Sequence, residues 1–179
     1  AVMDSCVAHC PQPISADNAP YVLERAQMNM NAGEYRSAML DYDTYFKAVD
    51  GQVNDVFYYY REQAEFKARQ YQRALDDIAK AIELNPKELT YRAEQAVINL
   101  RVGRYEEALK VLDEVLAIDP KYAEAQAVVK KFYEEAKPFY EKARALKPDQ
   151  QDLWLQGLYR VYYNLNMGPE FEEIDKMMK

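Results

Sequence analysis

The chain has 179 residues, of which 49% are hydrophobic and 30% are charged, with 5 glycines, 8 prolines and a formal net charge of −7. This length is enough to bury a core as one elongated domain, and the low glycine and proline content favours helices. The acidic balance argues against nucleic acid as the main partner, because phosphate backbones are bound by basic surfaces. No run of about 18 apolar residues occurs, so no membrane insertion is predicted.

Residues 1–18 are predicted to form the end of a helix and a linker interrupted by prolines. The sequence CVAHC within this segment contains both cysteines and the only histidine. Cys6 and Cys10 would share one helical face, with His9 close by. A closed zinc site needs a fourth ligand, which no second Cys/His cluster supplies, and a disulfide within one helical turn strains normal geometry. We therefore predict no metal site and no cofactor.

A 17-residue segment with tyrosine second, alanine fifth and proline last occurs at Gln70–Pro86 and again at Arg104–Pro120, 34 residues later (104 − 70 = 34). A third copy, Phe132–Pro148, aligns the same three positions, and residues 34–50 match them less completely. In Tyr105–Ile118 the apolar residues recur every three to four positions, which predicts an amphipathic helix. The recurring segment is therefore predicted to be a helix that ends before its proline.

A second helix is predicted between successive copies, as at residues 89–103. Gly33 and Gly103 stand before the recurring helix, where the turn needs a positive φ that glycine adopts most easily. The predicted unit is helix, short turn, helix, short turn, and the predicted fold class is all-α.

The last interval between copies is shorter than the others. Tyr71 and Tyr105 are 34 residues apart, but Tyr105 and Tyr133 are only 28 apart, a difference of 6 (34 − 28 = 6). Two alternatives explain this: one long helix bent near Pro138, or a loop that is absent from the printed sequence. We favour the absent loop as a hypothesis, which the intact mass of the protein would test.

These features resemble the tetratricopeptide repeat (TPR), a 34-residue helix–turn–helix unit with a small residue in its first helix and glycine, tyrosine, alanine and proline at set positions. The unit 89–122 matches it best, with Ala96, Gly103, Tyr105, Ala108, Leu112 and Pro120. The unit 55–88 departs from the pattern at Glu62, where a small residue is usual, and at Arg69, where glycine is usual. The chain is also similar to uncharacterised bacterial members of the family.

The resemblance implies an all-α superhelix, a TPR solenoid of about four repeats. The first segment resembles the second helix of an earlier repeat, so we expect the chain to belong to a longer array. The expected boundaries are a helix remnant and linker at 1–18, repeats at 19–54, 55–88 and 89–122, a shortened or interrupted repeat at 123–148, and a degenerate repeat with capping helices at 149–179.

TPR arrays bind peptides or protein segments along the concave face formed by the first helix of each repeat, so the resemblance implies a protein-interaction scaffold. Several of the residue types at these positions are common interface anchors. For the apolar residues the alternative is packing within the stack, and for the polar ones simple solvation. The positions carried over are Leu23, Gln27, Met30, Asn31, Tyr59, Gln63, Phe66, Lys67, Ala93, Val97, Leu100 and Arg101.

Family members that bind chaperone tails hold a terminal carboxylate with Lys, Asn and Arg side chains. This chain lacks the cationic pair that a carboxylate requires, so we do not expect chaperone-tail binding. The corresponding positions hold Leu23, Gln27, Tyr59, Gln63, Ala93 and Val97.

No catalytic activity is predicted, because one histidine cannot supply a triad or a general-base pair and no glycine-rich phosphate loop is present. Glu106, Glu107, Asp113 and Glu114 are predicted to lie on solvated helix faces. The alternative function is structural: the terminal helices within 153–179 would pack against a second copy, which requires concentration-dependent dimerisation. The compartment stays open between the cytoplasm and export to the envelope with a signal removed.

Overall fold

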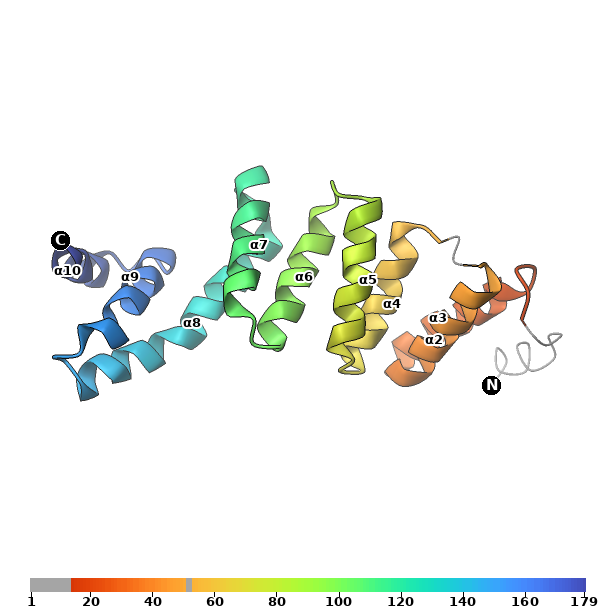
Figure 1. Ribbon diagram of the computed structural model, residues 1–179, viewed down its shortest axis with the longest axis horizontal. Helices are drawn as coiled ribbons and strands as arrows, with labels where there is room; N and C mark the ends of the chain where they lie inside the picture. Colours follow the sequence, from red (N-terminus) through yellow and green to blue (C-terminus); the bar gives the residue numbers. More distant parts are fainter. Residues whose placement is uncertain (1–13, 51–52) are drawn as a thin grey trace. The chain divides into compact units, whose positions relative to one another are not determined.

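The structure is a computed structural model that describes residues 14–50 and 53–179, and all regular elements in these ranges are helices (Figure 1). The chain divides into two compact units, Ala1–Val111 and Leu112–Lys179, which are described in turn. The segment with Cys6, His9 and Cys10 lies outside the described residues, so the interpretation of CVAHC stays a prediction.

The first unit is built from successive pairs of helices joined by short turns. Figure 1 shows α2 beside α3 and α4 beside α5, and short connections of this kind make the partners antiparallel. The sequence predicted the bounds of α7, which extends from this unit into the second. The helices are α2 (Ala19–Ala32), α3 (Tyr35–Ala48), α4 (Asp55–Lys67), α5 (Tyr71–Leu84), α6 (Leu89–Arg101) and α7 (Tyr105–Ile118).

The turns within the pairs use the left-handed conformation that the glycines predicted. Gly33 has φ 79° and Gly103 has φ 82°. The backbone N–H groups of Gly33 and Glu34 donate to Met30 and Asn29, which satisfies carbonyls at the end of α2. Arg69 occupies the equivalent turn between α4 and α5 with φ 63°, although it carries a Cβ atom.

The core of the first unit is made of alanines and larger apolar side chains from neighbouring helices. Ala26, Ala38 and Ala64 cluster with Tyr42, so one core joins α2, α3 and α4. A second core joins α4, α5 and α6. It contains Ala74, Leu75, Ile78, Ala81, Tyr91 and Ile98, with half-buried Tyr58, Tyr59, Phe66, Tyr71 and Ile82 against it.

The second unit contains one long helix where the sequence left two alternatives open. α8 (Ala123–Leu146) is a single helix of 24 residues with Pro138 inside it. This is the first alternative, and the turn that precedes Tyr71 and Tyr105 has no counterpart before Tyr133. The absent loop stays a prediction, which the intact mass of the protein would test. The unit continues with η1 (Gln151–Leu153), α9 (Leu155–Asn164) and α10 (Gly168–Met178).

One side of α8 is covered by the helices that follow it. The indole N–H of Trp154 donates to the Lys147 carbonyl at 3.1 Å, and the Arg144 guanidinium lies 5.4 Å from the Trp154 ring centre. Gly157 allows α9 to come close, because a Cβ atom there would lie 2.2 Å from Cε1 of Tyr140. The core of this unit also contains Leu158, Val161, Tyr162 and Ile174, all buried.

Arg69→Gly is expected to raise the free energy of unfolding by about 0.5–1 kcal/mol, because a residue with a Cβ atom is strained at positive φ. The greater freedom of glycine in the unfolded chain offsets part of the gain. Gly103→Ala is the matched control: φ is 82° and the added Cβ would meet no atom within 4 Å, so backbone strain alone should lower the stability. Urea unfolding followed by circular dichroism measures both, and a destabilised Arg69→Gly would contradict the argument.

Candidate partner-binding face

The twelve predicted contact residues lie on α2, α4 and α6, the first helices of three successive pairs. In each helix they are the fifth, ninth, twelfth and thirteenth residues, which places them within about 100° of one another around the helix axis. We call this set the A-helix face. That it binds a partner stays a prediction, whereas the structure shows how its members are packed.

The A-helix face combines half-buried apolar side chains with exposed polar ones. Ala93 is only 5% exposed, so it contributes backbone and a methyl group at most. The exposed members are Gln27, Asn31, Lys67 and Arg101, and the half-buried members are Leu23, Met30, Tyr59, Gln63, Phe66, Val97 and Leu100. Partly buried apolar side chains together with exposed polar ones are the usual composition of a protein interface. The thirteenth residues, Asn31, Lys67 and Arg101, lie at one edge of the face and form its polar rim.

The apolar members of the face also hold the helices together. Leu23 and Met30 pack against the core that joins α2, α3 and α4. The Tyr59 ring lies 5.2 Å from Tyr91, and the Phe66 ring lies 5.7 Å from Tyr71. Packing within the stack, which the sequence left as an alternative for these positions, is therefore confirmed for Phe66. Its side chain cannot be removed without disturbing the core, and this limits which variants can test binding.

A network of ion pairs on α4 was missed by the sequence analysis. The Arg61 guanidinium donates to both carboxylate oxygens of Asp77, from Nε at 2.6 Å and from Nη2 at 2.8 Å. Its Nη1 donates to Asp43 at 3.1 Å, and Arg73 donates to the same Asp43 oxygen at 2.7 Å. Two arginines thus share one carboxylate, which links α3, α4 and α5. Paired, geometrically matched contacts of this kind are stronger than single ones.

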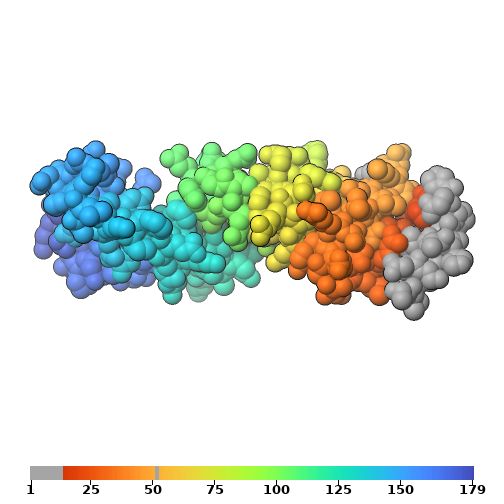
Figure 2. All heavy atoms as spheres, turned by 90° about the horizontal axis from the view of Figure 1, so that it is seen from below, coloured from red at the N-terminus to blue at the C-terminus, as the bar shows by residue number. Residues whose placement is uncertain are grey.

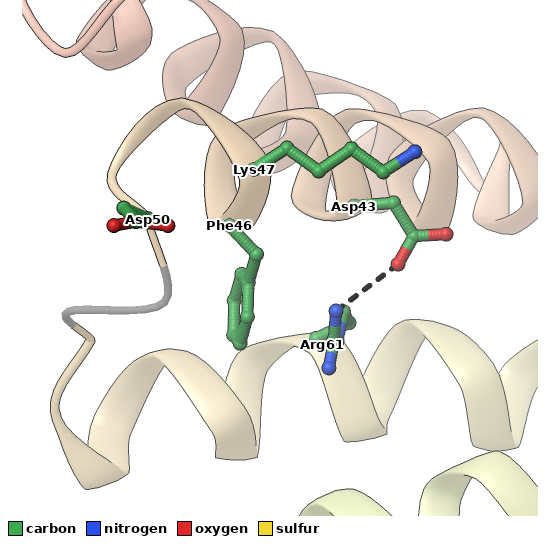
Figure 3. A pocket seen from close by; sticks show the side chains of 5 residues that line it. All are labelled: Asp43, Phe46, Lys47, Asp50 and Arg61. Atoms are coloured by element: carbon green, nitrogen blue, oxygen red, sulfur yellow. Dashed lines mark hydrogen bonds and ion pairs between the residues drawn. The ribbon is translucent and has the colours of Figure 1, made fainter.

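An open hollow of about 500 Å³ lies beside this network, between α3 and α4 (Figure 3). The Arg61 guanidinium lies 3.8 Å from the centre of the Phe46 ring, and Figure 3 shows the Asp43 and Arg61 side chains directed toward each other. The remaining lining residues are Lys47 and Asp50 at its exposed rim. Because Arg61 and Asp43 already pair with each other, we assign no ligand to the hollow.

Two carboxyl groups of α4 are buried. Glu62 and Glu65 are each 1% exposed, and Oε2 of Glu62 accepts no hydrogen bond. Burial, followed by the nearby Glu94, Glu65 and Asp77, raises the pKa of Glu62 to about 9, so its carboxyl group is neutral at pH 7. The sequence indicated an unusual environment for Glu62, because it places an acidic residue where the repeat usually has a small one.

Glu65 lies in a mixed environment on the same helix. Nη2 of Arg73 is 2.8 Å from Oε1 of Glu65, but outside hydrogen-bond geometry. Burial and Asp77 raise the pKa of Glu65, while Arg73 and Arg61 act in the opposite direction. Among the described residues, no group of three or more His, Cys, Asp or Glu side chains is placed to hold a metal ion. These acids are therefore part of the packing between helices.

Other charged positions follow the sequence expectation. Glu106, Glu107, Asp113 and Glu114 are all exposed on α7, which confirms that they lie on solvated faces. None of the described helices combines the length and apolar character that crossing a bilayer requires.

Comparisons with known proteins match the fold and the repeat. The model of the family described as "Anaphase-promoting complex, cyclosome, subunit 3" matches residues 15–115, more than half of the chain. Tetratricopeptide repeat protein 28 of Mus musculus is 35% identical over 117 residues, which are 64% of this chain and 5% of that protein. The chain thus spans about 5% of the length of the curated relatives that it matches.

Solved structures share the architecture at low identity. The crystal structure of MamA has a TM-score of 0.61 and 15% identity, covering 94% of this chain and 87% of that one. The first TPR of Spaghetti (RPAP3), bound to the HSP90 peptide SRMEEVD, has a TM-score of 0.57 and 22% identity, covering 70% and 98%. These likenesses concern the fold, and they confirm the all-α TPR architecture predicted from the sequence.

Glu62→Gln is expected to remove most of one pH-dependent contribution to stability. The pKa of Glu62 is about 9 when folded against 4.5 when unfolded, so the folded chain keeps a proton that the unfolded chain releases between these values. The stability contributed by wild-type Glu62 is therefore fully present below about pH 4.5 and is lost as the pH rises to about 9. Glutamine is neutral throughout, so between pH 5 and pH 8 the free energy of unfolding of the variant should rise by about 4 kcal/mol relative to wild type, at about 1.4 kcal/mol per pH unit.

Chemical unfolding at a series of pH values measures this difference. Glu24→Gln, at an exposed position on α2, is the matched control and should follow wild type. Parallel stability curves for wild type and Glu62→Gln would show that Glu62 is not held neutral.

Proposed function

Because the chain belongs to the tetratricopeptide repeat family, whose members are protein-interaction scaffolds, we propose that it binds a peptide or an extended protein segment across the A-helix face. The observation that supports this proposal is the composition of the face. The corresponding faces of α2, α4 and α6 carry both half-buried apolar and exposed polar side chains. The apolar ones include Tyr59, Val97 and Leu100, and the polar ones include Gln27 and Arg101. We propose a binding role and no catalytic one.

Helical packing makes the face suitable for an extended ligand. Its side chains project from helices whose opposite faces are fixed in the two cores, so the face is preformed and the partner segment bears most of the loss of conformational entropy. Gln27 and Gln63 are the ninth residues of successive first helices, and each side-chain amide can both donate to and accept from a peptide backbone.

The charge of the rim favours acidic residues in the bound segment. Lys67 and Arg101 are both exposed and occupy the last turn of α4 and α6. The Spaghetti domain holds an HSP90 peptide. The clamp positions of such domains are occupied here by residues such as Leu23 and Val97, so we propose an internal acidic–apolar segment and not a chaperone tail as the ligand.

The alternative, self-association through the helices within 153–179, has one observation in its favour. Tyr163 on α9 is 63% exposed, and Met177 and Met178 on α10 are 37% and 42% exposed. This would be a structural role with no ligand on the A-helix face, and a dimer that is lost when the exposed residues of α9 and α10 are changed would support it.

A random peptide library displayed on phage tests the scaffold proposal. Peptides selected on the wild-type chain are synthesised and their affinities measured by calorimetry. Lys67→Glu/Arg101→Glu should weaken binding about tenfold or more, because both changes place repulsive charge on the rim. The control Arg36→Glu/Lys80→Glu makes the same change in net charge at exposed positions of α3 and α5, and should stay within about twofold of wild type.

Amide chemical shifts locate the bound peptide independently of the variants. The proposal expects the largest changes at residues of α2, α4 and α6. Equal affinities for wild type and both double variants, or shifts confined to α3 and α5, would place the site elsewhere. Selection of no peptide at all would also count against the proposal.

A further inference from the structure

The helix α8 carries a row of apolar side chains, two of which are largely exposed. Phe139 is 75% exposed and Leu146 is 70% exposed. With half-buried Phe132 they recur every seven residues, which keeps them within about 40° of one another around the helix, and half-buried Ala136 and Ala143 lie between them. We call these five residues the α8 seam. Figure 2 shows atoms of α8, in cyan, at the surface of the second unit.

The helices that follow α8 cover a different side of it. Tyr140 meets Gly157 of α9, and Arg144 contacts Trp154 and pairs with Glu173 of α10. Tyr140 and Arg144 are rotated from the middle of the seam by roughly a quarter to a third of a turn. The core of the second unit therefore leaves Phe139 and Leu146 of the seam exposed.

The short repeat interval accounts for the exposure of Phe139 and Leu146 on this face. Ala136 aligns with Ala74 and Ala108, each of which is 0% exposed. Those two alanines belong to helices that begin after a turn, whereas Ala136 lies in the middle of one continuous helix and is half-buried. A continuous helix cannot fold back on itself, so Phe139 and Leu146 stay exposed on a face that the corresponding helices of other repeats bury.

The seam is complementary to itself when two copies run antiparallel. With Phe139 at the two-fold axis, Phe132 of one helix lies opposite Leu146 of the other, and Ala136 lies near Ala143, so large and small layers alternate. In the same register exposed Glu135 lies opposite exposed Lys142 of the other copy, twice by symmetry. We propose that the α8 seam binds a second copy of this chain through antiparallel pairing of the two α8 helices.

Sedimentation equilibrium tests the proposal on the whole chain. Wild type should dimerise with increasing concentration, and Phe139→Glu should raise the dimer dissociation constant at least about tenfold. Tyr163→Glu is the matched control, also a largely exposed aromatic, on α9 (63% against 75%), and should stay within about twofold of wild type. Circular dichroism checks that both variants keep their helices. A monomeric wild type at all concentrations, or a dimer lost in Tyr163→Glu but kept in Phe139→Glu, would overturn the proposal.

Two further variants test the register and direction of the pair. Glu135→Lys or Lys142→Glu alone should weaken dimerisation about threefold, and the double exchange should restore it. In a Cys6→Ser/Cys10→Ser background, Phe139→Cys should form a disulfide-linked dimer on oxidation and Leu146→Cys should not. If both variants form linked dimers, the helices are parallel and the antiparallel pair is overturned. If neither variant forms a linked dimer, the antiparallel pair is overturned as well. The Phe139→Glu monomer should still bind the selected peptides, so this inference and the proposed function can fail separately.

Discussion

Alanine at the points where helices cross sets the spacing on which this structure depends. Ala26, Ala38, Ala64, Ala74 and Ala96 are each 0% exposed. A side chain that ends at Cβ lets neighbouring helices approach closely, so that the ridges of one pack into the grooves of the next. No single helix pair can bury its apolar stripe alone, and each pair is completed by its neighbours. The A-helix face follows from this constraint, because equal spacing presents the same helix positions in every repeat.

Glu62 shows what happens when that constraint is broken at one position. It is the eighth residue of α4, equivalent to Ala26 in α2 and Ala96 in α6. A carboxyl group there cannot reach water, and Arg61 is already bound to Asp77 and Asp43, so the group is buried in its neutral form. A local exception of this kind is expected where another role outweighs packing. Here it gives α4, the middle helix of the A-helix face, a contribution to stability that depends on pH.

Helix bounds and turns could be predicted from the sequence because they depend on residues close along the chain. The 34-residue spacing, the apolar period of α7 and the glycines at 33 and 103 were sufficient for that. The exposure of a face depends on contacts from other repeats, which is why Ala93 lies on the predicted face and yet is 5% exposed. The network around Asp43 joins residues 18 and 30 positions apart, and no local pattern indicates which arginine pairs with which acid.

In a repeat array each apolar helix face is covered by a neighbouring unit. In the second unit Phe139 and Leu146 of α8 are largely exposed instead. The interval between the tyrosines at 105 and 133 is six residues short of a repeat, and α8 is one continuous helix there. A face with phenylalanine, leucine and alternating alanines has the composition of an interface rather than a cap. The same sequence change that interrupts the repeat thus creates the surface through which two copies can pair.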